Sequence, residues 1–165
     1  MIAAVGHTDL TPETLALVEE ELRSRLAHLE EDATGLVRVG AGLPVAFGRA
    51  VREAGRSLVV LLPAQGSVPA VLPRRDRPAA GELLRLAEQM RLMPYDPEGR
   101  DACVGADERM IATSRHLLAV WDGSPSDGRD ATAHLVAYAR SRGIPVDIIW
   151  PPGATRRRPT GAALS

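Results

Sequence analysis

Short apolar runs alternate with amphipathic stretches along most of this chain, and this alternation restricts the possible folds more than any other feature. The clearest run, Leu58–Leu62, is continuous and apolar, as in a strand covered on both faces. Between the runs, apolar residues recur every three or four positions, which is the spacing of one buried helical face. The pattern predicts strands at Ile2–Val5, Leu36–Val39, Leu58–Leu62, Gln89–Met93, His116–Trp121 and Pro145–Trp150.

A helix is expected after each of the first five runs. The first has a clear start signal, because Thr11 can cap it, Pro12 suits the first helical position and Glu13 complements the helix dipole. The stretch 64–78 is different: it is rich in proline and arginine and has no periodicity, so it is interpreted either as a lid or as a surface excursion, with Pro63 ending the strand before it. The expected helices span residues 12–29, 43–54, 82–88, 98–114 and 129–142.

Alternating strands and helices predict an α/β fold in three layers: a mostly parallel sheet of about six strands with helices on both faces. Residues 1–152 are expected to form one domain, and 153–165, rich in Pro, Gly and Arg, a flexible basic tail. Ligands of such sheets bind beyond the carboxyl ends of the strands, where the strand order reverses. The loops that follow the strands are therefore the places to look for a site.

Composition excludes several kinds of function. The chain of 165 residues has 20 cationic and 21 acidic side chains, a balance that makes nucleic-acid binding an unlikely role. Every cation is an arginine, so lysine Schiff bases and a Walker-type phosphate lysine are excluded. No apolar run approaches the length of a membrane span, no signal peptide is recognisable, and the single Cys103 suits a reducing compartment, so a cytoplasmic protein is expected. The four histidines show no zinc-ligand spacing, and we predict no metal and no cofactor.

Glycine-rich strand ends are the strongest functional signal. Glycine lets a backbone approach a ligand closely, and amides at the start of the next helix attract anions. The loop 122–132 is the best phosphate candidate, although Asp127 and Asp130 would repel an anion unless they face away, and the loop can equally be a solvated turn with an Asp or Ser cap. The predicted ligand-binding residues are Gly6, His7, Thr8, Gly40, Ala41, Gly42, Asp122, Gly123, Gly128, Arg129, Asp130, Ala131 and Thr132.

Other residues carry weaker signals. Gly40-Ala41-Gly42 lacks the third glycine of a dinucleotide fingerprint, because Val45 stands in its place. His7, at a strand tip, is interpreted equally as a ligand contact or a turn cap, and Cys103 as a core residue. His28 is expected on the surface, His116 in a structural role, His134 near the pocket, and Trp121 and Trp150 packed at the sheet edges or stacked on a base.

The strand-end residues resemble the SLOG superfamily, the Rossmann-like group that includes the Lonely Guy phosphoribohydrolases and the DNA-uptake processing proteins. The resemblance is carried by three segments, Val5-Gly6-His7, Val39-Gly40-Ala41-Gly42 and Leu117–Gly123, and spans about residues 1–152. It implies a nucleotide pocket at the strand ends and self-association as a homodimer. Nucleoside deoxyribosyltransferases have a similar layout, which a strand-end Asp122-Gly123 matches.

The sequence departs from the Lonely Guy pattern at both catalytic positions. The glutamate of the family's last loop falls on Leu135, and its catalytic arginine falls on Ala106. The first hypothesis is therefore a domain that binds a nucleotide or nucleotide-derived small molecule without phosphoribohydrolase activity. The second is an N-glycosyl hydrolase or deoxyribosyltransferase-like enzyme that uses a relocated carboxylate, Asp122, Glu108 or Asp96, and the third is a non-catalytic partner-binding module.

Overall fold

The computed structural model describes residues 1–30 and 32–157, and in them every expected strand and helix is present. The strands are β1 (Ile2–Gly6), β2 (Gly35–Arg38), β3 (Leu58–Gln65), β4 (Val68–Pro69), β5 (Gln89–Pro94), β6 (His116–Val120) and β7 (Val146–Ile149). The helices are α1 (Pro12–Ala27), α2 (Leu43–Glu53), α3 (Arg77–Leu86), α4 (Arg100–Ala112) and α5 (Thr132–Ser141), with a 3-10 turn at Arg74–Asp76.

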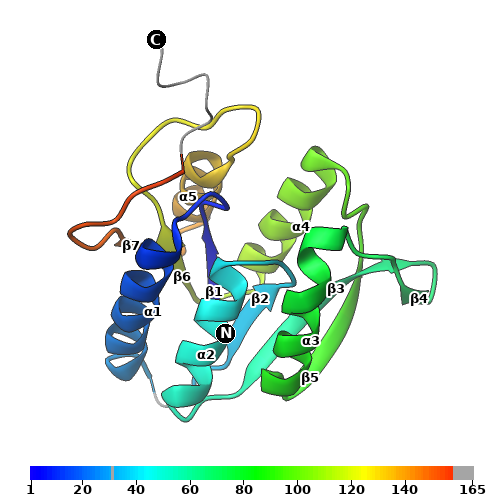
Figure 1. Ribbon diagram of the computed structural model, residues 1–165, viewed down its shortest axis with the longest axis horizontal. Helices are drawn as coiled ribbons and strands as arrows, with labels where there is room; N and C mark the ends of the chain where they lie inside the picture. Colours follow the sequence, from blue (N-terminus) through cyan, green and yellow to red (C-terminus); the bar gives the residue numbers. More distant parts are fainter. Residues whose placement is uncertain (31, 158–165) are drawn as a thin grey trace.

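The strands form a single sheet that is parallel except for the short β4 (Figure 1). Its order is β5–β3–β2–β1–β6–β7, with β4 paired antiparallel to the end of β3. The chain builds outward from β1 through β2 and β3 to β5, and then returns to place β6 on the other side of β1. The predicted α/β class is confirmed, and the strand order is that of a Rossmann-like fold, reversing beside β1.

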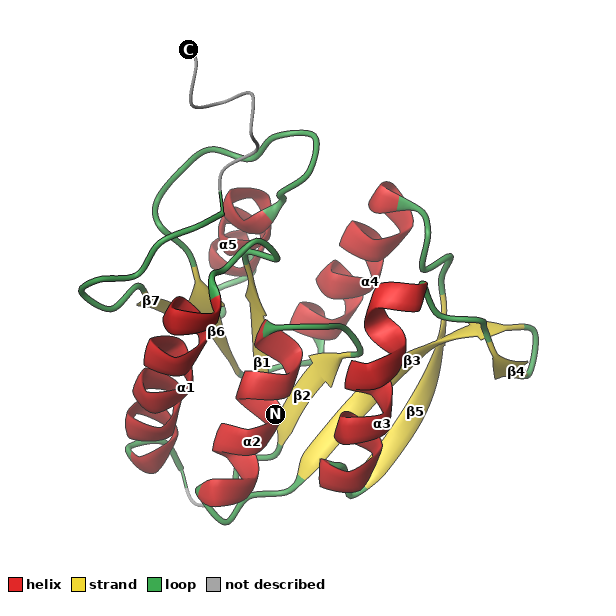
Figure 2. Cartoon of the chain, viewed as in Figure 1, coloured by secondary structure: helices red, strands yellow, loops and turns green. Residues whose placement is uncertain are grey.

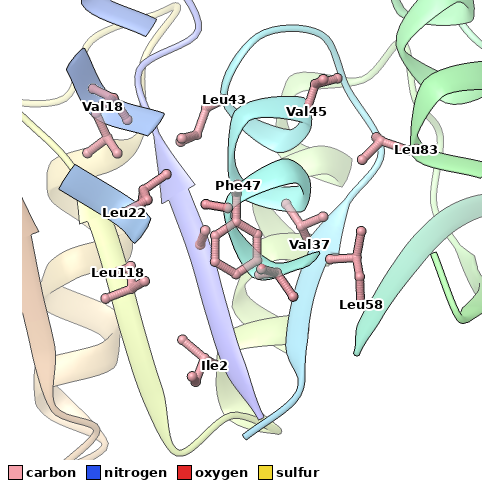
Figure 3. Close-up of a cluster of buried hydrophobic side chains, with 14 of the residues drawn as sticks. Ile2, Val18, Leu22, Val37, Leu43, Val45, Phe47, Leu58, Leu83 and Leu118 are labelled. Atoms are coloured by element: carbon pink, nitrogen blue, oxygen red, sulfur yellow. The ribbon is translucent and has the colours of Figure 1, made fainter. Parts of the chain in front are cut away.

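Helices cover both faces of the sheet, as the alternation predicts (Figure 2). One apolar cluster packs α1, α2 and α3 on one face, and a second packs α4 and α5 on the other. The first is centred on Phe47 of α2, which is completely buried among strand and helix side chains (Figure 3). The expected stripe of α1 is buried at Val18, Leu22 and Leu26. These two clusters hold the strand ends in fixed positions.

The stretch 64–78 is not the irregular lid that the lack of periodicity suggested. Pro63 does not end its strand: β3 continues to Gln65, turns at Gly66 and pairs back through β4. The missing N–H of Pro63 costs no bond to β2, because the last β2 pair in the ladder is Arg38 with Leu61. The carbonyl of Pro63 accepts from the amide of Ala70, which ties the hairpin to β3.

Two helix boundaries also differ from the expectation. α3 begins at Arg77, five residues earlier than expected, because Pro78 suits its first turn. α5 begins at Thr132, three residues later, because the preceding residues fold into a turn of their own. The described helices include none with the length and apolar character needed to cross a lipid bilayer.

Part of the expected basic tail is bonded to the domain. Arg156 forms an isolated antiparallel bridge with Leu10, and its neighbour Arg157 donates its amide to the carbonyl of Asp9 over 2.6 Å. The amide of Thr155 donates to Oγ1 of Thr14 over 2.7 Å. The expected boundary at residue 152 therefore precedes a docked segment, and residues 158–165 of the tail lie outside the described residues.

Candidate ligand site at the strand ends

A cavity of about 630 Å³ lies at the carboxyl ends of β1 and β2, between the starts of α2, α4 and α5. We call it the strand-end pocket. It lies beside β1, where the strand order reverses, and its volume is in the range of about 300–1,000 Å³ found for small-molecule sites. The place is the one that the sequence pattern led us to expect.

Most of the predicted ligand-binding residues line this pocket, and three do not. The lining set is Gly6, His7, Thr8, Gly40, Ala41, Gly128, Arg129, Asp130, Ala131 and Thr132. Gly42 and Gly123 have positive φ angles of 80° and 89° and serve the backbone at a helix start and a turn. Asp122 lines a neighbouring hollow instead.

Gly6 is required for packing. A Cβ placed on it would lie 2.7 Å from the backbone oxygen of Val120 and 2.7 Å from the side chain of Leu43. A side chain at this position would push β1 away from β6 and α2. Gly40 is different, since an added Cβ would meet only Pro44 at 3.5 Å, so this backbone is open to a ligand.

Three of the amides expected to hold phosphate before α5 are already bonded within their own loop. The amides of Arg129 and Asp130 donate to Oδ1 of Asp127 over 2.7 and 2.8 Å. The amide of Thr132 donates to Oδ1 of Asp130 over 2.9 Å, and that of His134 donates to Oγ of Ser126 over 3.0 Å. The loop therefore folds as the alternative interpretation describes, as a turn capped by Asp and Ser side chains.

His7 is buried between two carboxylates. Its Nδ1 lies 2.6 Å from Oδ2 of Asp130 and its Nε2 lies 3.0 Å from Oδ1 of Asp122. Burial raises the pKa of Asp130, but the bonds from His7 and from the amide of Thr132 outweigh it and lower that pKa to about 2. Because an ionised carboxylate only accepts, Nδ1 of His7 carries a proton and donates to Asp130. His7 thus holds the loop 122–132 and does not face a ligand with a free nitrogen.

Arg156 completes this group from the C-terminal segment. Its guanidinium lies 2.9 Å from Oδ1 of Asp9, 3.4 Å from Oδ2 of Asp130 and 3.5 Å from Oδ2 of Asp122. Its Nη1 also donates to Oγ of Ser124 over 3.1 Å. The residues around it border a second hollow of about 820 Å³, which shares Thr8, Arg129 and Asp130 with the strand-end pocket. The carboxylate of Asp130 therefore stands in the wall between the two hollows.

The ligand atoms of His7, Asp9 and Asp130 also lie within 4.8 Å of one another, a grouping that a metal ion could use. Sequence spacing gave no sign of it, because 123 residues separate His7 from Asp130. The guanidinium of Arg156 is bonded to two of the three residues and supplies the positive charge there. The guanidinium of Arg156 therefore stands where a metal ion would otherwise balance the charge of these carboxylates.

An ion pair that the sequence analysis missed forms part of the pocket wall. Nε and Nη2 of Arg38, at the end of β2, donate to the two carboxylate oxygens of Asp107 on α4 over 2.9 and 3.2 Å. Burial lowers the pKa of Arg38, but the charge of Asp107 outweighs this effect, so the pKa is raised overall. An arginine inside an otherwise apolar strand was the available signal, since a buried charge needs a partner.

The same wall carries Cys103 and, behind it, Tyr95. Cys103 lines the pocket, which corrects the prediction that it is a core residue, and its burial raises its pKa. The guanidinium of Arg38 lies 5.5 Å from the centre of the Tyr95 ring. Burial raises the pKa of Tyr95 to about 12, and its hydroxyl has no hydrogen-bond partner among the described residues.

Two other helix starts meet the pocket without a side-chain cap. α2 begins after Gly42 and α4 after Gly99, and neither start is capped by a side chain. Gly99 and Arg100 line the pocket beside Arg75, which comes from the 3-10 turn before α3. Uncapped helix starts and guanidinium groups both favour an anion. Asp76 and Glu98 line the same side of the pocket, and Asp76 accepts the amide of Ala41 just before α2, so charges of both signs stand there.

The three carboxylates proposed for catalysis lie apart. Asp122 borders the second hollow, and its pKa is lowered because bonds from Ser124 and the contact with His7 outweigh its burial. Asp96 accepts the amide of Glu98 within a turn, and Glu108 lies 3.8 Å from His134 on the outer side of α4 and α5. Neither Asp96 nor Glu108 lines the strand-end pocket. Neither of the two cavities brings Asp122 together with Asp96 or Glu108, as a glycosidase pair would require.

The remaining predicted side chains have structural surroundings. His28 is exposed and bonds to the carbonyl of Ser24, while His116 pairs with Asp147 at 3.1 Å, as its structural role requires. Trp121 and Trp150 pack against the two apolar clusters, as expected.

A scan against protein-family models finds no match, and a search of curated proteins finds none either.

Proposed function

We propose that this protein binds a nucleotide or nucleotide-derived small molecule in the strand-end pocket and does not hydrolyse it as a Lonely Guy enzyme would. The observation that carries the proposal is the pocket itself, which combines the open backbone at Gly40 with the uncapped helix starts of α2 and α4 beside the strand reversal. The resemblance to SLOG strand ends supports the same ligand class.

The anionic group of the ligand belongs on the α2 and α4 side. Arg75 and Arg100 lie there, whereas the amides before α5 are bonded within their own loop. The sugar and base would then lie along the strand ends, near Gly40 and the Arg38–Asp107 pair. That pair offers a hydrogen-bond donor and an acceptor side by side, the combination that a base edge requires.

Calorimetric titration with nucleosides, mononucleotides, cyclic nucleotides and ADP-ribose derivatives tests the proposal. Arg75→Glu should weaken binding of a phosphorylated ligand about tenfold or more, because a favourable charged contact becomes a repulsive one. Arg74→Glu is the matched control, since Arg74 lies on the same 3-10 turn but does not line the pocket. Absence of heat with every ligand, or equal losses in the two variants, contradicts the proposal.

A further inference from the structure

Three donors converge on the carboxylate of Asp130. Its Oδ1 accepts the amide of Thr132 over 2.9 Å, at the start of α5. Its Oδ2 accepts from Nδ1 of His7 over 2.6 Å and from Nη2 of Arg156 over 3.4 Å. A helix amide, an imidazole N–H and a guanidinium are the groups that proteins use to hold a bound anion. Here the anion that they hold belongs to the chain itself.

The surroundings bind this carboxylate firmly. Asp130 is only 7% exposed, and it is a lining residue of both the strand-end pocket and the second hollow. Its bonds with His7 and Thr132 keep it ionised at neutral pH. Asp122 already contacts His7 and Arg156 beside it, so an external anion brought to these donors would meet two carboxylates at short range and be strongly repelled.

Arg156 reaches this place because the C-terminal segment 154–157 is docked. The backbone of Thr155 bonds to Thr14 and that of Arg157 bonds to Asp9, so the guanidinium between them is directed at the three aspartates. The segment therefore connects the chain end to the start of α5.

We propose that Asp130 is a built-in anion that fills a latent anion site at the start of α5, and that Arg156 of the docked segment holds it there. The site then admits no phosphate while Asp130 occupies it. Under the proposed function, on which this consequence rests, a phosphorylated ligand must place its phosphate at the α2 and α4 side of the same pocket. Asp130, held by Arg156 of the segment 154–157, thereby determines which end of the pocket accepts an anion.

The test uses the full-length, ¹⁵N-labelled chain and inorganic phosphate as the probe, with the amide resonance of Thr132 as the readout. In the native sequence this resonance should show no saturable shift. Asp130→Ala removes the built-in anion and leaves the other donors in place, so phosphate should bind there at least about tenfold more tightly. Asp130→Ser is the second variant if Asp130→Ala does not fold, because serine can still cap the helix.

A second substitution tests whether phosphate binding needs Arg156 itself or only a positive charge in the same segment. The gain should disappear in Asp130→Ala/Arg156→Gln and persist in Asp130→Ala/Arg157→Gln, since the adjacent Arg157 makes no side-chain hydrogen bond among the described residues. A saturable shift of Thr132 in the native sequence overturns the inference by itself. So does a folded Asp130→Ala or Asp130→Ser that shows no shift, or a gain that survives the loss of Arg156. Failure of nucleotide binding in calorimetry would remove the proposed function but leave these phosphate results standing.

Discussion

Replacing Asp130 with asparagine should make the protein less stable at neutral pH and remove part of its sensitivity to acid. The pKa of Asp130 is lowered from 3.8 to about 2 in the folded protein, because bonds from His7 and Thr132 outweigh its burial. At about 1.4 kcal/mol per pKa unit, this difference corresponds to roughly 2 kcal/mol of stability. The side chain is almost fully buried, so solvent screening does not reduce the figure much.

The sign follows from proton binding. The folded pKa lies below the unfolded one, so the unfolded chain binds the proton more tightly and acid favours unfolding. The contribution of Asp130 is fully present above pH 3.8 and is lost as the pH falls toward its folded pKa of about 2. The native protein and Asp130→Asn should therefore differ in unfolding free energy by roughly 2 kcal/mol at neutral pH and should converge in acid.

Urea unfolding at a series of pH values measures this difference. With a slope of about 1–3 kcal/mol per molar urea, the midpoint should fall by about 1 M at neutral pH. Asp101→Asn is the control, because the side chain of Asp101 is fully exposed. A difference between native protein and Asp130→Asn that stays constant from neutral pH down to the acid limit would refute the assignment of the lowered pKa to Asp130.

Two further predictions concern the walls of the strand-end pocket. Gly6→Ala should lower the unfolding free energy by about 1–3 kcal/mol, because the added Cβ would press on the backbone of Val120. Gly105→Ala is the control: this position inside α4 is open, so the substitution should raise the unfolding free energy by about 0.5–1 kcal/mol. Thermal unfolding distinguishes the two variants. Cys103 should be alkylated by iodoacetamide more slowly than free cysteine at neutral pH, because burial raises its pKa, and the rate should increase as the pH rises. Mass spectrometry follows the reaction at this single thiol. A rate equal to that of free cysteine would contradict the burial argument.

The strands and the main helices could be predicted because their signals are local. The buried stripe of α1 and the continuous apolar run of β3 each lie within one element, and parallel pairing follows from their alternation. Pro63 was misinterpreted because its effect depends on where β2 ends, which only the ladder shows. The position of the pocket was predictable for the same reason as the fold, since it follows from strand order.

The chemistry of the pocket was less predictable, because it depends on pairs that are far apart in the sequence. Arg38 and Asp107 are 69 residues apart, and Arg156 lies 147 residues from Asp9. Glycines and hydroxyls around position 130 are typical of a phosphate loop. The aspartates among them were the one local sign that the loop does not bind phosphate.

The aspartates of this loop lie beside the amides at the start of α5. An aspartate beside helix-start amides either repels an external anion or replaces it, and geometry decides which. Asp130 accepts the amide of Thr132 and is held by His7 and Arg156, so it takes the place of the anion. The small, hydroxyl-rich loop is therefore compatible with a nucleotide pocket whose phosphate lies elsewhere. The difference between a binding loop and a closed one rests on a single carboxylate and on Arg156, which bonds to it from the C-terminal segment 26 residues further along the chain.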